Sequence, residues 1–262
     1  MKAIQVSPDN TIQSEKIYLF IHGAWHGAWC WDKVIPLVQA NGHKAIAIDL
    51  PGHGHYIGRT LDFSLEDYVD EVVKTANDQM GPVILVGHSM SGIVISQAAE
   101  KLGARKVSAL IYLDAFLPRN GDSLFSLADA TQKQLPPNNS GKPSLLENII
   151  TSEDHKTNTV NPEMAEWLFY HDCSEEDKKF ALARISKEPI APLATPLNLT
   201  DDIYGVIPKY YILCTESKDM DKTFLSTHVP CKKVYKLASS HSPFFSMPGK
   251  LVEILDEIRY IA

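Results

Sequence analysis

A serine stands where an apolar run gives way to a helical pattern, in the segment PVILVGHSMSG that ends at Gly92. The run Val83–Val86 predicts a buried strand, and a helix from about Gly92 to Leu102 follows Ser89 closely. This pattern is typical of a nucleophile elbow, in which a tight turn exposes a serine hydroxyl and a helix directs its N–H groups toward it. Because an isolated serine is a weak nucleophile, the segment predicts catalysis only if a base and oxyanion donors lie nearby.

The fifth position of this motif departs from the usual G-x-S-x-G pattern. It holds Ser91, and the glycine comes one residue later at Gly92. Serine is also small, so we expect the close packing of helix and strand to survive. The pentapeptide alone leaves a second interpretation open, a surface serine in a chance strand–turn–helix, and the other catalytic parts must decide between the two.

A histidine near the C-terminus is the candidate base. His241, in the segment SSHSPFF, follows the last apolar run and precedes the closing helical pattern. A single histidine is more often structural or exposed. The order of serine, then acid, then histidine along the chain nevertheless favours a catalytic base that takes the proton of Ser89.

Two backbone amides are the candidate oxyanion donors. One belongs to Met90, directly after the serine, and the other to the loop that follows the apolar run Ile17–Ile21. That loop reads His22-Gly23-Ala24-Trp25, and Ala24 is the predicted donor. Gly23 lets the chain turn sharply and approach the pocket closely.

The acid that should bind the far nitrogen of the base has several candidates. Asp114 directly follows the apolar run Ala109–Leu113. The run Tyr210–Cys214 is followed by T-E-S-K-D, and this stretch offers Glu216, Asp219 and, two residues further on, Asp221. The spacing alone does not choose among these carboxylates.

Two other motifs are rejected as cofactor or metal sites. Gly52-His53-Gly54 follows a strand pattern, but a third glycine is absent and the next residues are bulky, which disfavours a dinucleotide loop. The pairs His53/His55 and His22/His26 have spacings that a metal could use, yet no carboxylate-rich motif accompanies either pair. We therefore expect neither a cofactor nor a metal.

Alternating strand and helix patterns surround these residues and predict a mostly parallel α/β sheet with helices on both faces. Ser64, with Asp67 three residues later, marks a helix start. The predicted strands are the runs 17–21, 45–48, 83–86, 109–113, 210–214 and 234–237. The predicted helices cover residues 31–40, 65–77, 93–102 and 249–258.

The alternation breaks between Phe116 and Pro208, where the sequence holds several prolines and no convincing β-run. Helical patterns occupy residues 123–130, 162–171 and 175–185. A helical insertion over the strand ends is the expected arrangement, and the apolar run Trp167–Tyr170 disfavours a floppy connection. One structural domain then consists of a core, residues 1–117 and 205–262, and a lid, residues 118–204.

The chain has 262 residues, 44% of them hydrophobic and 22% charged, as in ordinary globular proteins. Its net charge of −7 argues against a nucleic-acid or anionic-membrane partner. The four cysteines are widely spaced, which predicts free thiols. The N-terminal residues show no signal-peptide pattern and no run reaches transmembrane length, so a cytoplasmic enzyme is expected.

Six segments together resemble the α/β-hydrolase superfamily, and within it the branch of plant methylesterases of the salicylate-binding type, hydroxynitrile lyases and bacterial pyrethroid-type esterases. These segments are FIHGAWHGAWCW (20–31), NGHKAIAIDLPGHG (41–54), VILVGHSMSG (83–92), YLDAFLP (112–118), ILCTE (212–216) and HSPFF (241–245). The resemblance implies the α/β-hydrolase fold with a helical lid inserted after its sixth strand. It also implies hydrolysis of carboxylic esters without a cofactor.

The same resemblance disfavours lyase chemistry. Hydroxynitrile lyases carry a threonine directly after the first histidine of the early loop and a lysine directly after the catalytic histidine. The lysine supplies positive charge for the departing cyanide. This chain has Gly23 and Ser242 at those places, so cyanohydrin cleavage is not expected.

The acid is the point at which the chain departs from this branch. Members usually read C-T-x-D after the penultimate strand, and here Ser217 occupies the place of the aspartate. Asp219 or Glu216 could reach in from a shifted loop, Ser217 could leave the triad without a carboxylate, or Asp114 could substitute from the preceding strand. We favour Asp114, because it directly follows a strand and no shift of its loop is needed to place it. The alternative is that Asp114 is a structural carboxylate at the entry to the lid.

These observations predict a serine carboxylesterase for small to medium hydrophobic esters, with Ser89, His241 and Asp114 as catalytic residues and Ala24 and Met90 as oxyanion donors. The alternative is a catalytically weak scaffold that binds a small ligand. The expected partner is a small-molecule ester, and the resemblance admits a homodimer, which no residue of the sequence demonstrates. The expected substrate pocket comprises His22, Gly23, Trp25, His88, Phe116, Leu124 and Trp167, with the further apolar lid residues Phe125, Leu127 and Phe169.

Overall fold

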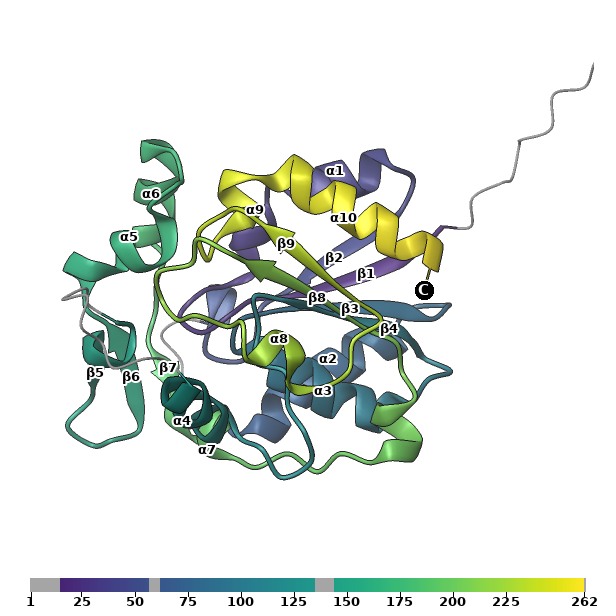
Figure 1. Cartoon of the computed structure of the whole chain (residues 1–262), viewed down its shortest axis with the longest axis horizontal. Coiled ribbons are helices and arrows are strands. Elements are labelled where there is room, and N and C mark those ends of the chain that lie inside the picture. The colour runs from purple at the N-terminus through teal and green to yellow at the C-terminus, as the bar shows by residue number, and fades with distance from the viewer. Residues whose placement is uncertain (1–14, 57–61, 135–143, 262) are drawn as a thin grey trace, which may run out of the picture.

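Six parallel strands form the centre of the molecule (Figure 1). The strands are β1 (Ile17–Ile21), β2 (Lys44–Ile48), β3 (Val83–His88), β4 (Val107–Leu113), β8 (Lys209–Cys214) and β9 (Lys233–Leu237). Their order across the sheet is β2-β1-β3-β4-β8-β9, and every neighbouring pair is parallel. The predicted strands are confirmed, with ends that differ by one or two residues.

The structure is a computed structural model that describes residues 15–56, 62–134 and 144–261. The predicted core and lid ranges also include residues 1–14, 57–61, 135–143 and 262, which lie outside the described residues. The N-terminal segment examined for a signal peptide and part of the proline-containing stretch fall in these ranges.

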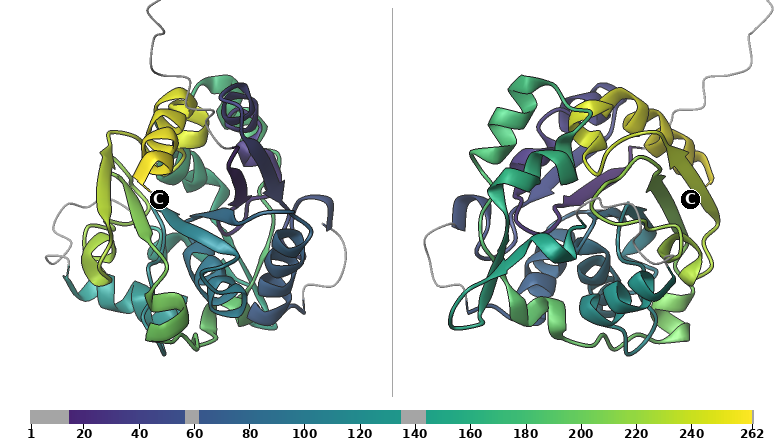
Figure 2. Two further views of the ribbon diagram at one scale, coloured as in Figure 1. Left: turned by 90° about the vertical axis from the view of Figure 1, so that its right-hand side faces the viewer. Right: turned by 60° about the vertical axis from the view of Figure 1, so that its left-hand side comes forward.

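Strands in the middle of the sheet are apolar on both faces and form the core. Every residue of β3 and of β8 is buried. A strand buried on both faces requires helices on both. The helices α1 (Ile35–Ala40) and α10 (Pro248–Ile261) cover one face, and α2 (Leu65–Asn77) and α3 (Ser91–Leu102) cover the other, as Figures 1 and 2 show. The four cysteines carry free thiols, as predicted.

Local signals determine where the helices begin. The Ser64 side chain accepts a hydrogen bond from the amide of Asp67, whose carboxylate accepts one from the amide of Ser64, so α2 begins with the predicted capping box. The predicted helix 31–40 is instead divided into a 3-10 turn, η1 (Ala28–Trp31), and α1. Pro36 lies in the first turn of α1, where a missing N–H is tolerated, and this fixes the later start.

The segment between β4 and β8, here called the cap, contains strands as well as helices. Its antiparallel sheet has the order β5 (Ile149–Thr151), β6 (Thr157–Val160) and β7 (Glu188–Pro189). The expectation of no β-run is therefore wrong, because strands of two to four residues are too short to give a periodic apolar signal. The cap also follows the fourth described strand of this chain rather than a sixth.

The cap helices α5 and α6 lie beside the small sheet at one side of the molecule (Figure 1). The cap helices are α4 (Leu124–Gln134), α5 (Pro162–Tyr170), α6 (Glu175–Leu182) and α7 (Ile190–Ala194). The remaining short elements are η2 (Gly54–Tyr56), η3 (Leu146–Asn148), the π-helical turn η4 (Asp201–Gly205), α8 (Leu225–His228) and α9 (Pro243–Ser246).

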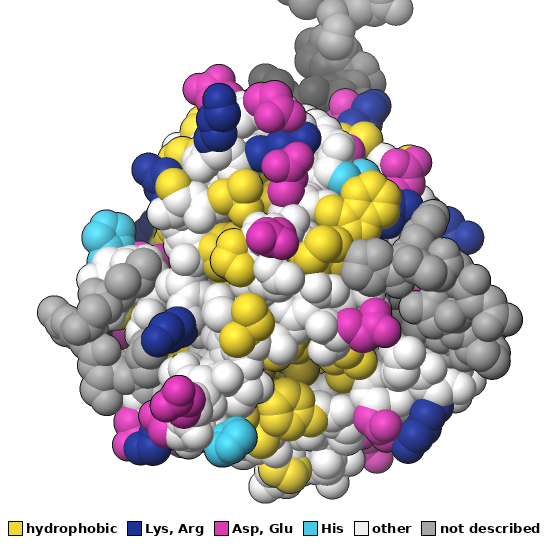
Figure 3. Space-filling view, turned by 90° about the vertical axis from the view of Figure 1, so that its left-hand side faces the viewer, with side chains coloured by type: hydrophobic (Ala, Val, Ile, Leu, Met, Phe, Trp, Pro, Cys, Tyr) yellow, Lys and Arg dark blue, Asp and Glu magenta, His cyan; other side chains and the backbone are white. Residues whose placement is uncertain are grey.

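The outer face of the cap mixes apolar and charged side chains (Figure 3). Among the described residues of the cap, six large apolar side chains are exposed, namely Phe125, Leu146, Ile150, Trp167, Ile203 and Val206. Phe125 and Trp167, which the sequence suggests as pocket lining, therefore reach solvent. None of the helices in the described ranges has both the length and the apolar character needed to cross a membrane.

Candidate active site

Ser89 lies on a strained turn between the end of β3 and the start of α3. Its φ of +53° is in the left-handed region that residues other than glycine rarely adopt. Backbone hydrogen bonds hold the turn, because the amide of Ser89 donates to the carbonyl of Leu113 and its own carbonyl accepts from the amides of Gly92 and Phe116, each at 3.1 Å. The backbone therefore has the shape of a nucleophile elbow.

Two glycines allow the turn to pack closely against its surroundings. A Cβ at Gly87 would lie 2.8 Å from the carbonyl oxygen of Ser91, and a Cβ at Gly92 would overlap the carbonyl oxygen of Phe116. The close approach thus occurs at Gly92, one residue after the position where the usual motif has glycine. This explains why Ser91 is tolerated at the fifth position.

We expect Gly92→Ala to lower the free energy of unfolding by about 3 kcal/mol or more, because the added methyl group overlaps backbone that cannot rotate away. Gly249→Ala in α10 is the matched control, since a Cβ at Gly249 meets no atom within 4 Å. Urea unfolding followed by circular dichroism measures both variants. Equal stabilities would contradict the packing described for Gly92.

The loop after β1 lies against this elbow. A Cβ at Gly23 would lie 2.9 Å from the Cβ of Ser89, so glycine permits the approach of the two segments. The hydroxyl of Ser91 donates a hydrogen bond to the carbonyl oxygen of His22 and ties the start of α3 to the same loop. The loop predicted to carry an oxyanion donor is therefore in contact with the candidate nucleophile.

Two buried amides at the elbow are unpaired. Ala24 follows Gly23, Met90 follows Ser89, and the N–H of neither residue donates a hydrogen bond to another described residue. Buried backbone N–H groups are nearly always paired in proteins, so two unpaired ones close to a serine indicate a place for an oxygen atom of a bound molecule. The structure brings both predicted oxyanion donors to the elbow.

The carboxylate that meets His241 is that of Asp114, at the end of β4. Its Oδ2 lies 2.7 Å from Nδ1 of His241, and both side chains are buried. Because a carboxylate can only accept a hydrogen bond, Nδ1 of His241 carries the proton, and Nε2 keeps a lone pair that can accept a proton. Asp114 has a φ of +44°, and its Oδ1 accepts a hydrogen bond from the amide of Cys214 at 3.1 Å. Glu216, one of the other candidates, is exposed.

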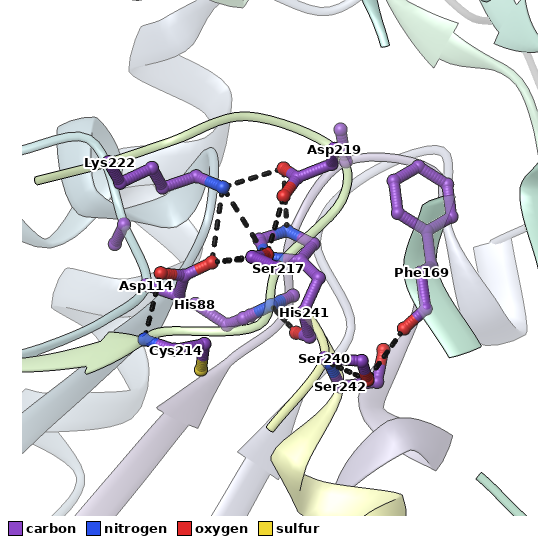
Figure 4. A network of polar contacts seen from close by, with 12 residues as sticks. His88, Asp114, Phe169, Cys214, Ser217, Asp219, Lys222, Ser240, His241 and Ser242 are labelled. Carbon is purple, nitrogen blue, oxygen red and sulfur yellow. Dashed lines mark hydrogen bonds and ion pairs between the residues drawn. The ribbon is translucent and has the colours of Figure 1, made fainter. Parts of the chain in front are cut away.

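Asp219 and Lys222 complete a buried polar cluster around this pair (Figure 4). Lys222 Nζ donates to Asp219 Oδ2 at 2.6 Å and to Asp114 Oδ2 at 3.1 Å, and it lies 3.5 Å from Nδ1 of His241. Asp219 Oδ2 lies 3.5 Å from Nε2 of His241. The hydroxyl of Ser217 lies 2.6 Å from Asp219 Oδ1 and 3.0 Å from Asp114 Oδ2. Ser217 therefore contacts both aspartates from the place where the branch that the sequence resembles usually has its acid.

The cluster keeps the carboxylate of Asp114 ionised. Burial on its own would raise the pKa of Asp114, but the Lys222 ammonium and the hydrogen bond with His241 outweigh burial and lower this pKa to about 2. Burial likewise disfavours the charged form of Lys222, and the two carboxylates outweigh it and raise the pKa of Lys222. Asp114, Asp219 and His241 lie close enough together to bind a cation, and the ammonium of Lys222 already donates to both carboxylates.

Sequence reasoning missed Lys222, because a lysine in a charged loop is usually solvated. The one signal available was the spacing of three residues between Asp219 and Lys222, and many exposed ion pairs share that spacing.

We expect Lys222→Met to lower kcat/KM at neutral pH about tenfold and to move the acidic limb of its pH profile to higher pH. Without the ammonium, the carboxylates of Asp114 and Asp219 face His241 uncompensated and favour the imidazolium, which cannot accept a proton. Lys222→Arg, which keeps the charge, is the control. Profiles between about pH 5 and 9 test this, and a Lys222→Met profile that matches the parent would contradict it.

Two of the predicted pocket histidines hold the backbone of the site. His22 Nδ1 binds the carbonyl of Gly23 at 2.8 Å, and its Nε2 accepts from the amide of Leu50 at 3.1 Å, which leaves no polar ring atom for a substrate. Burial lowers the pKa of His22 to about 3. His88 Nε2 lies 2.9 Å from the carbonyl oxygen of His241, to which it can donate, and the two rings are 4.4 Å apart.

The remaining histidines of the rejected metal pairs also have partners. His26 contacts the carbonyl of Ala24 through Nδ1 and the hydroxyl of Tyr170 through Nε2, both at 2.7 Å. His53 Nε2 lies 2.8 Å from a carboxylate oxygen of Glu188. The exposed ring of His55 contacts the carboxylate of Asp49 through Nδ1.

The cap contacts the loop that carries His241. The amide of Ser240 donates to Asp172 at 2.8 Å, and its hydroxyl donates to the carbonyl of Phe169 at 3.1 Å. The ring of Phe169 lies 5.9 Å from that of His241. Of the predicted apolar lining, Trp25, Phe116, Leu127 and Phe169 are buried, Leu124 is half-buried, and Phe125 and Trp167 are exposed.

The hydroxyl of Ser89 makes no hydrogen bond to a described residue, and the serine is 9% exposed. Catalytic hydrogen bonds are often long in unliganded enzymes and shorten when the substrate binds. The ring of His241 lies 4.4 Å from that of His88, the residue before Ser89. A serine next to unpaired amides, with a carboxylate-bound histidine beside its own segment, is chemically suited to acyl transfer.

Comparison with known proteins agrees with this geometry. A family model described as the alpha/beta hydrolase family matches residues 18–254. The chain belongs to this family. The predicted family and fold class are therefore confirmed for this α/β hydrolase.

Relatives of this α/β hydrolase include methylesterases. Putative methylesterase 11, chloroplastic, from Arabidopsis thaliana is 33% identical over 258 residues, which cover 94% of this chain and 64% of the relative. The chain thus spans just under two thirds of that relative. Salicylic acid-binding protein 2 from Nicotiana tabacum is 28% identical over 254 residues, which cover 94% of this chain and 97% of that protein.

Solved structures with the same fold include that of a hydrolase. A pyrethroid hydrolase superposes with a TM-score of 0.79 at 26% identity, and the match covers 94% of this chain and 98% of that one. This α/β hydrolase is therefore methylesterase-like and falls in the branch that its sequence motifs predict.

Proposed function

We propose that this α/β hydrolase is a serine carboxylesterase that hydrolyses small to medium hydrophobic carboxylic esters through an acyl-enzyme. The observation that carries the proposal is the elbow itself, where Ser89 stands on a left-handed turn close to two unpaired buried amides. The buried pair of Asp114 and His241 and the similarity to methylesterases support it.

In the acylation step, Oγ of Ser89 attacks the carbonyl carbon of the ester while Nε2 of His241 takes the hydroxyl proton. The negative charge moves to the carbonyl oxygen, where the amides of Ala24 and Met90 donate to it. When the tetrahedral intermediate collapses, the bond to the alcohol oxygen breaks. His241 then returns the proton to the departing alcohol.

In the deacylation step, a water molecule takes the place of the alcohol. His241 accepts a proton from this water, whose oxygen attacks the acyl carbon, and the same two amides hold the second oxyanion. The bond between the acyl group and Ser89 breaks, and the serine oxygen recovers its proton from His241. The products are the free acid and the regenerated enzyme.

The buried cluster suits this movement of protons. In the resting enzyme, Asp114, Asp219 and Lys222 together carry one net negative charge. When His241 becomes an imidazolium, that charge is neutralised, so the transient cation forms in a complementary environment. The other charged side chains of the cluster can keep their positions during this proton transfer.

The apolar surroundings favour hydrophobic esters. Phe116, Leu127 and Phe169 are buried, and the ring of Phe169 lies next to that of His241. Methyl esters of hydrophobic acids are the first physiological class to test, because the relatives include methylesterases.

The test is hydrolysis of p-nitrophenyl esters from acetate to octanoate, and of methyl esters of aromatic acids, by the parent protein and by Ser89→Ala. We expect turnover by the parent alone and no cyanide release from mandelonitrile. If the parent does not exceed Ser89→Ala with any ester, the proposal is wrong. Stoichiometric ligand binding without turnover would instead favour the weak-scaffold alternative.

A further inference from the structure

The residue that follows the candidate oxyanion donor has a strained backbone. Trp25 comes directly after Ala24 and has a φ of +65°, in the left-handed region that is sterically disfavoured for a large side chain. The orientation of the peptide plane between the two residues constrains the backbone conformation of Ala24. Within the loop, the amide of His26 donates to the carbonyl of Gly23 at 3.3 Å and closes a turn around Trp25. Contacts from outside the loop add to this single bond.

The cap binds every polar group of Trp25. The amide of Trp25 donates to Oε2 of Glu188 at 3.1 Å, and its carbonyl accepts from the amide of Ser186 at 2.9 Å. Its indole Nε1–H donates to Oδ1 of Asn158 at 2.9 Å. Asn158 on β6 and Glu188 on β7 are partners in the cap sheet, so one small sheet holds both the backbone and the side chain of Trp25.

Glu188 is fully buried and is bound from the core as well. Its Oε2 lies 2.8 Å from Nε2 of His53, and its Oε1 accepts from the hydroxyl of Tyr68 at 3.0 Å. Burial alone would lower the pKa of His53, but the carboxylate of Glu188 outweighs it and raises that pKa. A buried, paired charge of this kind has a fixed position, because moving it would leave a charge without its partner.

We propose that Glu188, assisted by Asn158, is a positioning residue that aims the amide of Ala24 at the oxyanion by holding Trp25 in its left-handed conformation. The cap is then a structural part of the oxyanion hole as well as a cover for the substrate. This inference rests on the proposed esterase function. Oxyanion donors act over a narrow range of distance. A small rotation of the loop therefore reduces the stabilisation of the transition state more than it reduces the affinity for the substrate.

The test uses Glu188→Gln, which keeps the shape of the side chain and removes its charge. We expect kcat for a p-nitrophenyl ester to fall about 10- to 100-fold while KM changes less than about threefold. Binding of a trifluoromethyl ketone, which forms an oxyanion when Ser89 adds to it, should weaken by the same factor as kcat/KM. A merely structural role would not produce this parallel loss.

Two other substitutions complete the design. Glu163→Gln changes an exposed glutamate of the same cap and should leave kcat and ketone binding unchanged. Asn158→Ala removes the hydrogen bond to the indole and should lower kcat several-fold at constant KM, and it decides the question if Glu188→Gln does not fold. Circular dichroism confirms folding at the assay temperature.

The outcomes separate this inference from the proposed function. A parent enzyme that hydrolyses esters, together with folded Glu188 and Asn158 variants of unchanged kcat and ketone affinity, would overturn the positioning role alone. A parent enzyme that hydrolyses no ester would overturn the proposed function, and with it the inference that depends on it.

Discussion

Ser89→Ala is expected to lower kcat/KM for p-nitrophenyl esters by about 10⁴-fold or more, because it removes the atom that forms the acyl-enzyme. The two amides and the apolar surroundings remain in this variant, so ester binding should change little. The residual rate reports what the oxyanion donors and substrate orientation supply without a nucleophile. Initial rates of p-nitrophenolate release measure the effect.

Ser96→Ala is the matched control for this substitution. Ser96 is a buried serine on the same helix, α3, and its hydroxyl is bound to the carbonyl of Gly92 and to the hydroxyl of Tyr112. Its replacement should leave kcat within about threefold of the parent. If Ser89→Ala retained activity comparable to that of Ser96→Ala, the catalytic role assigned to Ser89 would be wrong.

Asp114→Asn is expected to lower kcat by about 10³- to 10⁴-fold, whereas Asp219→Asn should lower it about tenfold or less. Asp114 accepts from Nδ1 of His241 at 2.7 Å and therefore selects the tautomer with a free Nε2. An asparagine there can donate to Nδ1 and favour the wrong tautomer. Asp219 lies 3.5 Å from Nε2 and acts mainly through Lys222.

Comparing the two aspartate variants identifies the acid directly. The reverse order of losses would make Asp219 the acid, and equal small losses would mean that His241 needs no carboxylate. Both variants change one oxygen to nitrogen in the same buried cluster, so each is the size-matched control of the other.

The same Asp114→Asn variant has a defined effect on acid stability. The pKa of Asp114 in the folded protein, about 2, lies below its ordinary value of 3.8, so the ionised carboxylate stabilises the fold above about pH 4. This stabilisation disappears as the pH falls toward 2. The difference in free energy of unfolding between the parent and Asp114→Asn should therefore narrow over that interval, and urea unfolding at several pH values measures it.

The sheet and its elbow could be predicted from the sequence because their signals are local. Continuous apolar runs predicted all six strands of the central sheet, and the capping box of Ser64 and Asp67 marked the start of α2. The turn at Ser89 was recognisable from small neighbours that the packing requires. These features depend on residues within a few positions of one another.

The acid and its supports depend instead on contacts between distant segments. Asp114, Asp219 and Lys222 come from two strand ends more than 100 residues apart in sequence, and only the fold brings them to His241. Lys222 and Glu188 belong to residue types that are usually solvated, so nothing in their local sequence indicates burial. The three short cap strands were missed for a related reason, because their pairing is defined by partners rather than by apolar periodicity.

The most direct test of the central claim is to trap the acyl-enzyme. The protein is mixed with p-nitrophenyl butyrate, quenched in acid during turnover, and examined by intact mass spectrometry and peptide mapping. The proposed mechanism predicts one butyryl group on Ser89 in the parent and none in Ser89→Ala. Turnover without an adduct on Ser89, or an adduct on another residue that accounts for the rate, would contradict the proposed mechanism.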